Sequence, residues 1–248
     1  MSTAPLRPAD RGEAADLAAF LRRLVHYDKA AAVRLQLTGE RLAVFGRPAS
    51  FEVLAVRTVL LDDAPAELDR TVSAGELLEL VHAESEPGAP FGVPEAVTGP
   101  PWAGVLPPRT GWRAEPGLPA PDAIRAAVAA VVAEFRTRTE ALAPEERTRT
   151  ALDAIGHEIW SRPLGDTALP VRAAHAAHAM GFLRPAPVRV PAASVPGDGG
   201  APAEPFALRS AGAWLRLRTP YGSVAVRRAG LGSVRRITVG ARGVSLRR

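Results

Sequence analysis

A proline- and tryptophan-rich stretch near the middle of the chain most constrains its fold. Val97–Trp112 contains four prolines, three glycines and two of the four tryptophans. Proline fixes the backbone φ angle and lacks an N–H donor, so this stretch cannot form a regular helix or a central strand. Its indole and aliphatic side chains are too apolar for a solvated linker. We therefore expect an ordered loop, packed on the folded core, that connects the chain before it to the chain after it.

A partner-binding loop is the other interpretation of the same residues. Trp102 and Trp112 would then contact another protein, and the chain would act as a protein–protein adaptor. The run PPWAGVLPPRTGW also resembles uncharacterised proteins of high-GC bacteria. This resemblance implies no function.

Composition excludes several classes of protein. The 248 residues include no cysteine, which excludes disulfides, thiolate metal sites and cysteine nucleophiles. The first residues contain no apolar segment typical of a secretory signal. No run of about 18 apolar residues occurs that could cross a membrane. We expect a cytoplasmic protein without a membrane partner, and the apolar fraction of 47% is sufficient for a sizeable core.

Residues 10–96 have the periodicity of a small α+β module. Apolar residues at helical spacing follow Asp10, and alternating apolar residues follow them. The expected elements are a helix at about 12–26, strands at 32–38, from Leu42 onward and at 51–61, and a helix after the capping box Ser73–Glu76. This order predicts an antiparallel sheet with two helices.

The order of elements over residues 17–81 resembles the first half of one subdomain of the bacterial DNA polymerase sliding clamp. The segments LQLTGERLAVFGRPASFEVLAVRTV and TVSAGELLELV carry the resemblance. It covers about a quarter of the chain and includes no diagnostic motif. A clamp needs several such subdomains closed into a ring, so the resemblance implies a fold for these residues and no function.

After the loop region, residues 97–120, the chain becomes helical in pattern. Residues 121–184 predict three helices, at about 121–142, from Pro144 to Pro163 and from Pro170 to Gly181. Residues 185–205 are rich in proline, glycine and alanine and are expected to form a linker. The fold class is therefore α+β, with an N-terminal antiparallel sheet and two helices, a helical middle, and a C-terminal basic β-hairpin segment at 206–248.

The charge of the chain is unevenly distributed. From Phe206 to Arg248 there are ten arginines and no acid, a net charge of +10. Residues 1–205 carry 21 basic and 26 acidic residues, a net charge of −5. Trp214–Arg218 and Ser223–Arg228 predict a hairpin with an apolar inner face and a basic outer face, and a second short hairpin is expected at about 235–246.

A basic β face of this kind can bind phosphates. We expect a non-enzymatic binding protein whose anionic partner is nucleic acid or, as the alternative, an acidic protein; the acidic body of the same chain could also occupy this face. Residues 145–228, three helices followed by a basic hairpin, resemble a winged-helix domain. The candidate nucleic-acid-binding residues are Arg216, Arg218, Tyr221, Arg227, Arg228, Arg235 and Arg236.

Catalytic motifs are not found in the sequence. It has no G-x-S-x-G elbow, no S-x-x-K motif and no P-loop. His157, His175 and His178 lie on two predicted helices and could converge in a small metalloenzyme or hydrolase, which is the third hypothesis. Because the H-E-x-x-H pattern is missing, we expect no catalytic residue, no cofactor and no metal.

Overall fold

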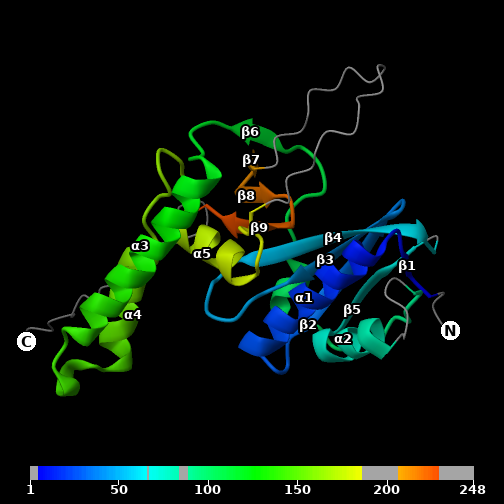
Figure 1. Ribbon diagram of the computed structural model, residues 1–248, viewed down its shortest axis with the longest axis horizontal. Coiled ribbons are helices and arrows are strands. Elements are labelled where there is room, and N and C mark those ends of the chain that lie inside the picture. The colour runs from blue at the N-terminus through cyan, green and yellow to red at the C-terminus, as the bar shows by residue number, and fades with distance from the viewer. Residues whose placement is uncertain (1–4, 66, 84–88, 186–205, 229–248) are drawn as a thin grey trace, which may run out of the picture.

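The computed structural model describes residues 5–65, 67–83, 89–185 and 206–228 (Figure 1). Their strands form a single antiparallel sheet in the order β5-β2-β3-β4-β9-β8-β7-β6, and a short β1 pairs with β4. The strands are β1 (Arg7–Pro8), β2 (Ala32–Thr38), β3 (Arg41–Gly46), β4 (Leu54–Asp63), β5 (Asp69–Ser73), β6 (Arg113–Glu115), β7 (Ala207–Ala211), β8 (Trp214–Thr219) and β9 (Gly222–Arg227).

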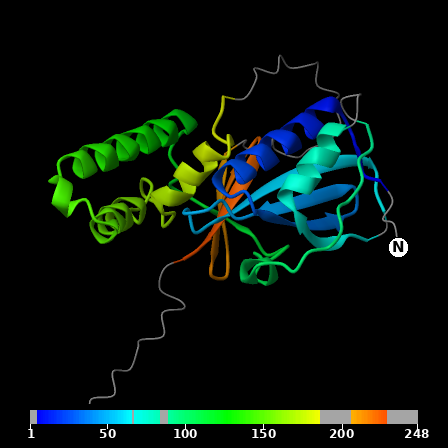
Figure 2. The same cartoon turned by 90° about the horizontal axis from the view of Figure 1, so that it is seen from below.

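The helices lie on one side of this sheet and beyond its end. They are α1 (Arg11–Tyr27), α2 (Ala74–Ala83), α3 (Pro121–Glu140), α4 (Arg149–Trp160) and α5 (Val171–Ala179), with short 3-10 turns η1 (Pro101–Gly104) and η2 (Pro144–Glu146). In Figure 2, α1 and α2 cover one face of the N-terminal strands, and the green turn η1 lies against the opposite face. The α+β prediction is confirmed. Within the described ranges, no helix combines the length and apolar character needed to cross a membrane.

Local sequence signals account for α1. The Asp10 carboxylate caps the helix by accepting a hydrogen bond of 2.9 Å from the Glu13 backbone N–H. Leu17, Phe20, Leu21 and Leu24 form its buried stripe. The Glu13 side chain, however, does not complete the capping box, because its carboxylate accepts a hydrogen bond from Arg57 instead.

Two predicted element boundaries were wrong, and a strand was missed. The third strand begins at Leu54 rather than residue 51, because Ser50 and Glu52 have φ angles of 69° and 53°, in the left-handed region that strands do not use. The strand β5 was not predicted. The helix expected from Pro144 is interrupted: η2 ends first, and α4 begins after Thr148, whose hydroxyl caps it by accepting a hydrogen bond from Ala151 N–H at 3.2 Å.

The C-terminal hairpin and the N-terminal strands share one sheet. Leu54, Ala55 and Val56 of β4 pair with Ala225, Val224 and Ser223 of β9. Leu215, Leu217, Val224 and Val226 are buried in the same apolar cluster as the N-terminal helices and strands. The ring of Phe182, just after α5, stacks on that of Phe20 in α1 with centroids 5.8 Å apart. Residues 206–228 therefore complete the core that the first hundred residues begin.

The pair α3 and α4 extends away from the sheet (Figure 1). Two arginines and two glutamates join these helices in one network. Arg162 bonds Glu134 at 2.6 Å and Glu158 at 2.9 Å, and Arg138 bonds Glu158 at 2.8 Å. Hydrogen bonds from Arg138 and Arg162 lower the pKa of Glu158 to about 2. These carboxylates remain charged near neutral pH and cannot act as general acids there.

Candidate nucleic-acid interface

The predicted basic face of the C-terminal hairpin lies on the side of the sheet away from α5. Cross-strand partners in an antiparallel sheet point to the same face. Arg216 pairs with Ala225 and Arg209, Arg218 pairs with Ser223, and Trp214 pairs with Arg227. The intervening Leu215 and Leu217 are buried on the other face. We call the arginine-bearing side the open face of the hairpin.

A hollow of about 680 Å³ opens on this face. Five arginines from four strands line it, and we call it the arginine basin. Among the described residues that line it, Glu13 is the only acid, and it is bonded to Arg57 at 2.8 Å. The lining residues are Glu13, Arg41, Arg57, Thr58, Leu60, Trp112, Arg209, Arg216, Arg218, Thr219, Pro220, Gly222 and Ser223. Sequence analysis did not identify Arg41, Arg57 or Arg209, because they reach the basin only through the pairing of β3 with β4, β4 with β9, and β7 with β8.

Arg216 is the central residue of the basin. Its Nε donates a hydrogen bond of 2.8 Å to the Ser223 hydroxyl, and its guanidinium lies 5.7 Å from the centre of the Trp112 ring. Burial, together with the charges of Arg218 and Arg209, lowers the pKa of Arg216 to about 10. Within the described residues, none of these three arginines forms an ion pair. In the part of the chain that the structure describes, the repulsion between them is therefore not offset by a direct ion pair.

Arg57 has a different role from its neighbours. It is only 7% exposed, and its guanidinium contacts Glu13 at 2.8 Å, Asp16 at 3.3 Å and the Tyr221 carbonyl at 2.9 Å. These contacts connect β4 to α1 and to the turn between β8 and β9. Arg57 thus contributes positive charge to the wall of the basin while its hydrogen bonds hold the wall in place.

Three other predicted nucleic-acid-binding residues lie outside the basin. Arg228 is on the opposite face and bonds Glu115 at 2.7 Å; hydrogen bonds from Ser210 and Arg228 lower the pKa of Glu115. Tyr221 lies under the Arg184 guanidinium at 3.6 Å and donates to the Pro185 carbonyl at 3.0 Å. Arg227 is exposed on the open face, farther along it. Arg235, Arg236, the hairpin predicted at 235–246, and 186–205 of the predicted linker lie outside the described residues.

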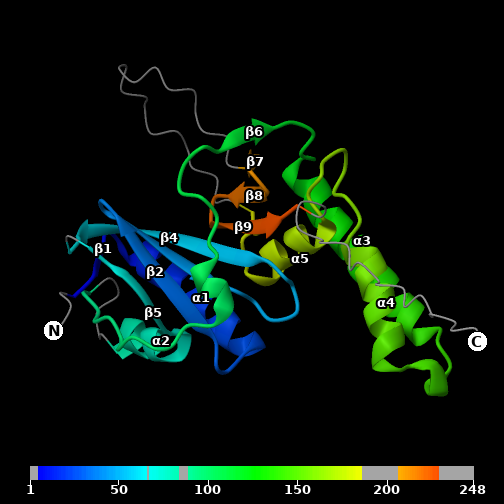
Figure 3. The same ribbon diagram turned by 180° about the vertical axis from the view of Figure 1, so that it is seen from behind.

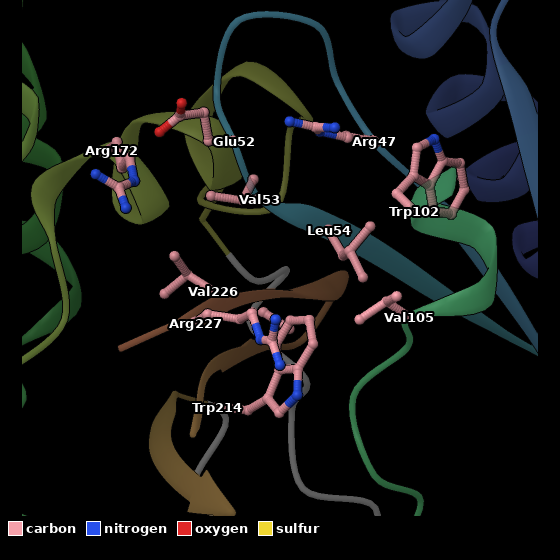
Figure 4. A pocket seen from close by; sticks show the side chains of 11 residues that line it. Arg47, Glu52, Val53, Leu54, Trp102, Val105, Arg172, Trp214, Val226 and Arg227 are labelled. Carbon is pink, nitrogen blue, oxygen red and sulfur yellow. The ribbon is translucent and has the colours of Figure 1, made fainter. Parts of the chain in front are cut away.

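The loop places its two indoles along this same face. Trp112 donates from Nε1 to the Pro108 carbonyl at 2.8 Å, which holds its ring beside Arg216. Trp102 in η1 lines a second, smaller hollow of about 210 Å³, together with Trp214 and Arg227 of the hairpin (Figure 4). At the start of the loop, Val97 N–H donates to the Thr71 carbonyl of β5 at 2.9 Å. The loop therefore runs from the far edge of the sheet to the hairpin, as Figure 3 shows.

The histidines predicted as a possible metal site do not form one. His175 is stacked on Trp160, with ring centres 4.6 Å apart, and burial followed by the charge of His178 lowers its pKa. Among the described residues there is no group of three or more His, Asp or Glu side chains that could hold a metal ion, and His157 and His178 are exposed. Residues 145–228 also do not form a separate winged-helix domain, because the hairpin of β8 and β9 pairs with β4 of the N-terminal sheet.

Repulsion within the basin leads to a first prediction. Arg218→Gln is expected to raise the free energy of unfolding of the free protein by about 0.5 kcal/mol, because it removes a like charge next to Arg216. The melting temperature should rise by about 1–2 °C, and by more at low ionic strength. Thermal unfolding at two salt concentrations measures the effect. Arg149→Gln is the control, because the Arg149 guanidinium lies 3.7 Å from the Asp153 carboxylate and so has an opposite charge beside it. An equal gain in stability in that variant would contradict the prediction.

Two family models match the chain. One is described as a domain of unknown function (DUF8185) and matches residues 107–231; the other, a domain of unknown function (DUF8010), matches residues 1–104. The two matched regions meet inside Val97–Trp112. No curated protein matches the chain at a significant level. Neither family model describes a sliding clamp, so that resemblance, like the taxonomic one, stays a prediction.

Proposed function

Because the chain belongs to the family of the domain of unknown function DUF8185, which brings no activity with it, we propose a function from the arginine basin itself. We propose that the protein is a non-enzymatic binder of nucleic acid and that the basin receives backbone phosphates. Arg209, Arg216 and Arg218 contact the phosphates directly, and Arg41 extends the positive surface at the rim.

The unpaired, half-buried Arg216 is the observation that carries this proposal. Among the described residues, none of the three guanidiniums of Arg209, Arg216 and Arg218 has an ion-pair partner, and burial together with the two neighbouring charges disfavours the charged form of Arg216. A bound phosphate would supply the missing negative charge. Arginine is suited to this role because its planar fork of donors can hold two phosphate oxygens at once.

The shape of the site supports an extended polyanion over an isolated inorganic ion. A hollow of about 680 Å³ with arginines on several sides is wide enough for more than one phosphate. An aromatic side chain next to the arginines, here Trp112, is a usual component of surfaces that bind nucleic acids by their backbone and bases.

A salt titration of the full-length protein tests the proposal. Binding of a fluorescently labelled 20-nucleotide DNA strand and of inorganic phosphate is measured at about 50 and 200 mM salt. For three to four phosphate contacts with a single strand, counterion release should weaken DNA binding roughly 20- to 50-fold over this range. Arg209→Ala, Arg216→Ala and Arg218→Ala should each weaken binding and lower the salt slope by about one.

Two controls separate the basin from general positive charge. Arg149→Ala removes an equal charge from α4, far from the basin, and should leave affinity almost unchanged. A chain ending at Arg228 keeps every described arginine of the basin and should retain most of the binding. Absence of binding at low salt, or equal losses in the Arg149 and Arg216 variants, would overturn the proposal, and tight binding of inorganic phosphate alone would do the same.

A protein partner at the loop is the second candidate function. Val97 is 38% exposed and Val105 is 49% exposed, and both lie in the loop near Trp102. Exposed aliphatic groups next to an indole are suited to apolar contact with another protein. Such an association would persist at high salt, unlike phosphate binding.

A further inference from the structure

A second hollow, which we call the indole pocket, opens on the same face as the arginine basin. Leu54 and Ala225 lie in its floor, Trp102 and Val105 come from the loop, and Trp214 comes from β8 (Figure 4). Arg227 lies over the Trp214 ring at 5.6 Å from its centre. Its volume of about 210 Å³ is below the range of roughly 300–1,000 Å³ typical of pockets that enclose whole ligands. The pocket is therefore suited to one flat group that belongs to a larger molecule.

The pocket and the basin are two parts of one continuous surface. Trp214, Arg216 and Arg218 alternate along β8 and point to the same face, and Trp214 lines the pocket while the two arginines line the basin. Arg218 lies four residue steps along the strand from Trp214, or roughly 13 Å. The loop follows the same line, with Trp102 at the pocket and Trp112 at the basin.

We infer that the nucleic acid bound by this protein is single-stranded, with its phosphates in the arginine basin and one of its bases in the indole pocket. The inference rests on the proposed function and goes further by naming the form of the ligand. Bases stack readily on aromatic side chains, and every base offers a flat face, so such a pocket needs no particular base sequence. In a duplex the faces of the bases are already stacked on each other, so no base face is free to stack on an indole of this pocket.

The charges around the pocket are consistent with a polyanion that continues past it. Arg47, Arg172 and Arg227 surround the pocket and Glu52 is its one acid. Arg172 Nε is buried without a hydrogen-bond partner, and within the described residues Arg47, Arg172 and Arg227 form no ion pair. A strand with a base on Trp102 in this pocket would present phosphates on both sides of that base, to the basin arginines and to these three.

The test compares a 20-nucleotide oligothymidylate with a 20-base-pair duplex on the full-length protein at about 50 mM salt. Intrinsic tryptophan fluorescence reports stacking, because three of the four tryptophans lie on this face and the fourth, Trp160, is stacked on His175. We expect tighter binding and stronger quenching with the single strand. Trp102→Ala should weaken single-strand binding roughly 5- to 150-fold, the range of one lost base stack.

Two conservative variants distinguish a lost base stack from other effects of replacing a tryptophan. Trp102→Phe retains a ring and should recover most of the affinity, and Trp160→Phe should leave both affinity and quenching by the oligonucleotide unchanged. This inference would be overturned if duplex and single strand bound with equal affinity and Trp102→Ala did not change that affinity. If Arg218→Ala still weakened binding, the basin proposal would stand. No binding of either nucleic acid would overturn both. Thermal unfolding of each variant shows whether a loss of binding comes from a loss of fold.

Discussion

Truncation of the chain after residue 205 is expected to abolish its cooperative unfolding transition. The cut removes β7, β8 and β9, and with them Leu208, Leu215, Leu217, Val224 and Val226, which are at most 3% exposed. Burial of each such side chain contributes roughly 1.5–3 kcal/mol, so the five together contribute on the order of 10 kcal/mol. This is comparable to the whole net stability of about 5–15 kcal/mol for a typical protein. The cut also leaves the first three residues of β4 unpaired on one side.

Circular dichroism during heating and a urea titration measure this effect. A chain ending at Arg228 is the matched control, because it keeps all described strands and should unfold cooperatively. A cooperative transition of the shorter chain, with a urea slope close to that of the longer one, would contradict the prediction. It would mean that the N-terminal sheet folds without the hairpin, and that the hairpin docks on a core already formed.

Replacement of Arg57 by methionine is the point substitution with the largest expected effect. Arg57→Met removes the cation that contacts Glu13, Asp16 and the Tyr221 carbonyl. Glu13 and the Tyr221 carbonyl lose this partner, whereas Asp16 keeps its ion pair with Arg184. Loss of one partner from a buried ion pair costs about 3–5 kcal/mol. Glu13 and Asp16 keep side-chain exposures of 23% and 25%, so some solvent compensates, and we expect a loss of about 2–4 kcal/mol. The melting temperature should fall by roughly 5–15 °C.

Arg41→Met provides the comparison, since Arg41 lines the same basin but is exposed, and its replacement should change stability by less than about 0.5 kcal/mol. In the double variant Glu13→Gln with Arg57→Met, the loss should be smaller than the sum of the two single losses, because the two side chains interact directly. Additive losses would show that the Arg57–Glu13 contact contributes little. Equal effects of the Arg41 and Arg57 variants would show that only basin charge matters.

Helices and strands whose signal lies in residues close together in the sequence were predicted well. β2 has the predicted bounds, α1 differs by one residue at each end, and the hairpin of β8 and β9 was expected with its arginines and leucines on opposite faces. In each case the signal is a repeat of apolar residues at the spacing of a helix or a strand. The segments β5, β6 and β7 were not predicted, because three to five residues are too few to show a repeat.

The candidate site was only half predicted, for a related reason. Arg216 and Arg218 were identified from charge along one hairpin. Arg57 stands in an apolar strand, and no local pattern indicates that it bonds Tyr221, 164 residues away in sequence. Glu13, the acid that lines the basin, stands in the first turn of α1, and no local pattern connects it to Arg57. Whether an arginine forms an ion pair depends on which acids the fold brings within about 4 Å. The sequence alone does not show which acids these are.

The sequence by itself determined the helices, the longer strands, the basic hairpin and the turn-rich loop, because backbone sterics, capping and apolar periodicity act over a few residues. Only the tertiary structure decided that β4 pairs with β9 and that the loop carries its two indoles to the hairpin. Strand pairing over such distances follows from burial of the apolar faces of both halves in one core. The basin, with its convergent and unpaired arginines, exists only as a consequence of that pairing.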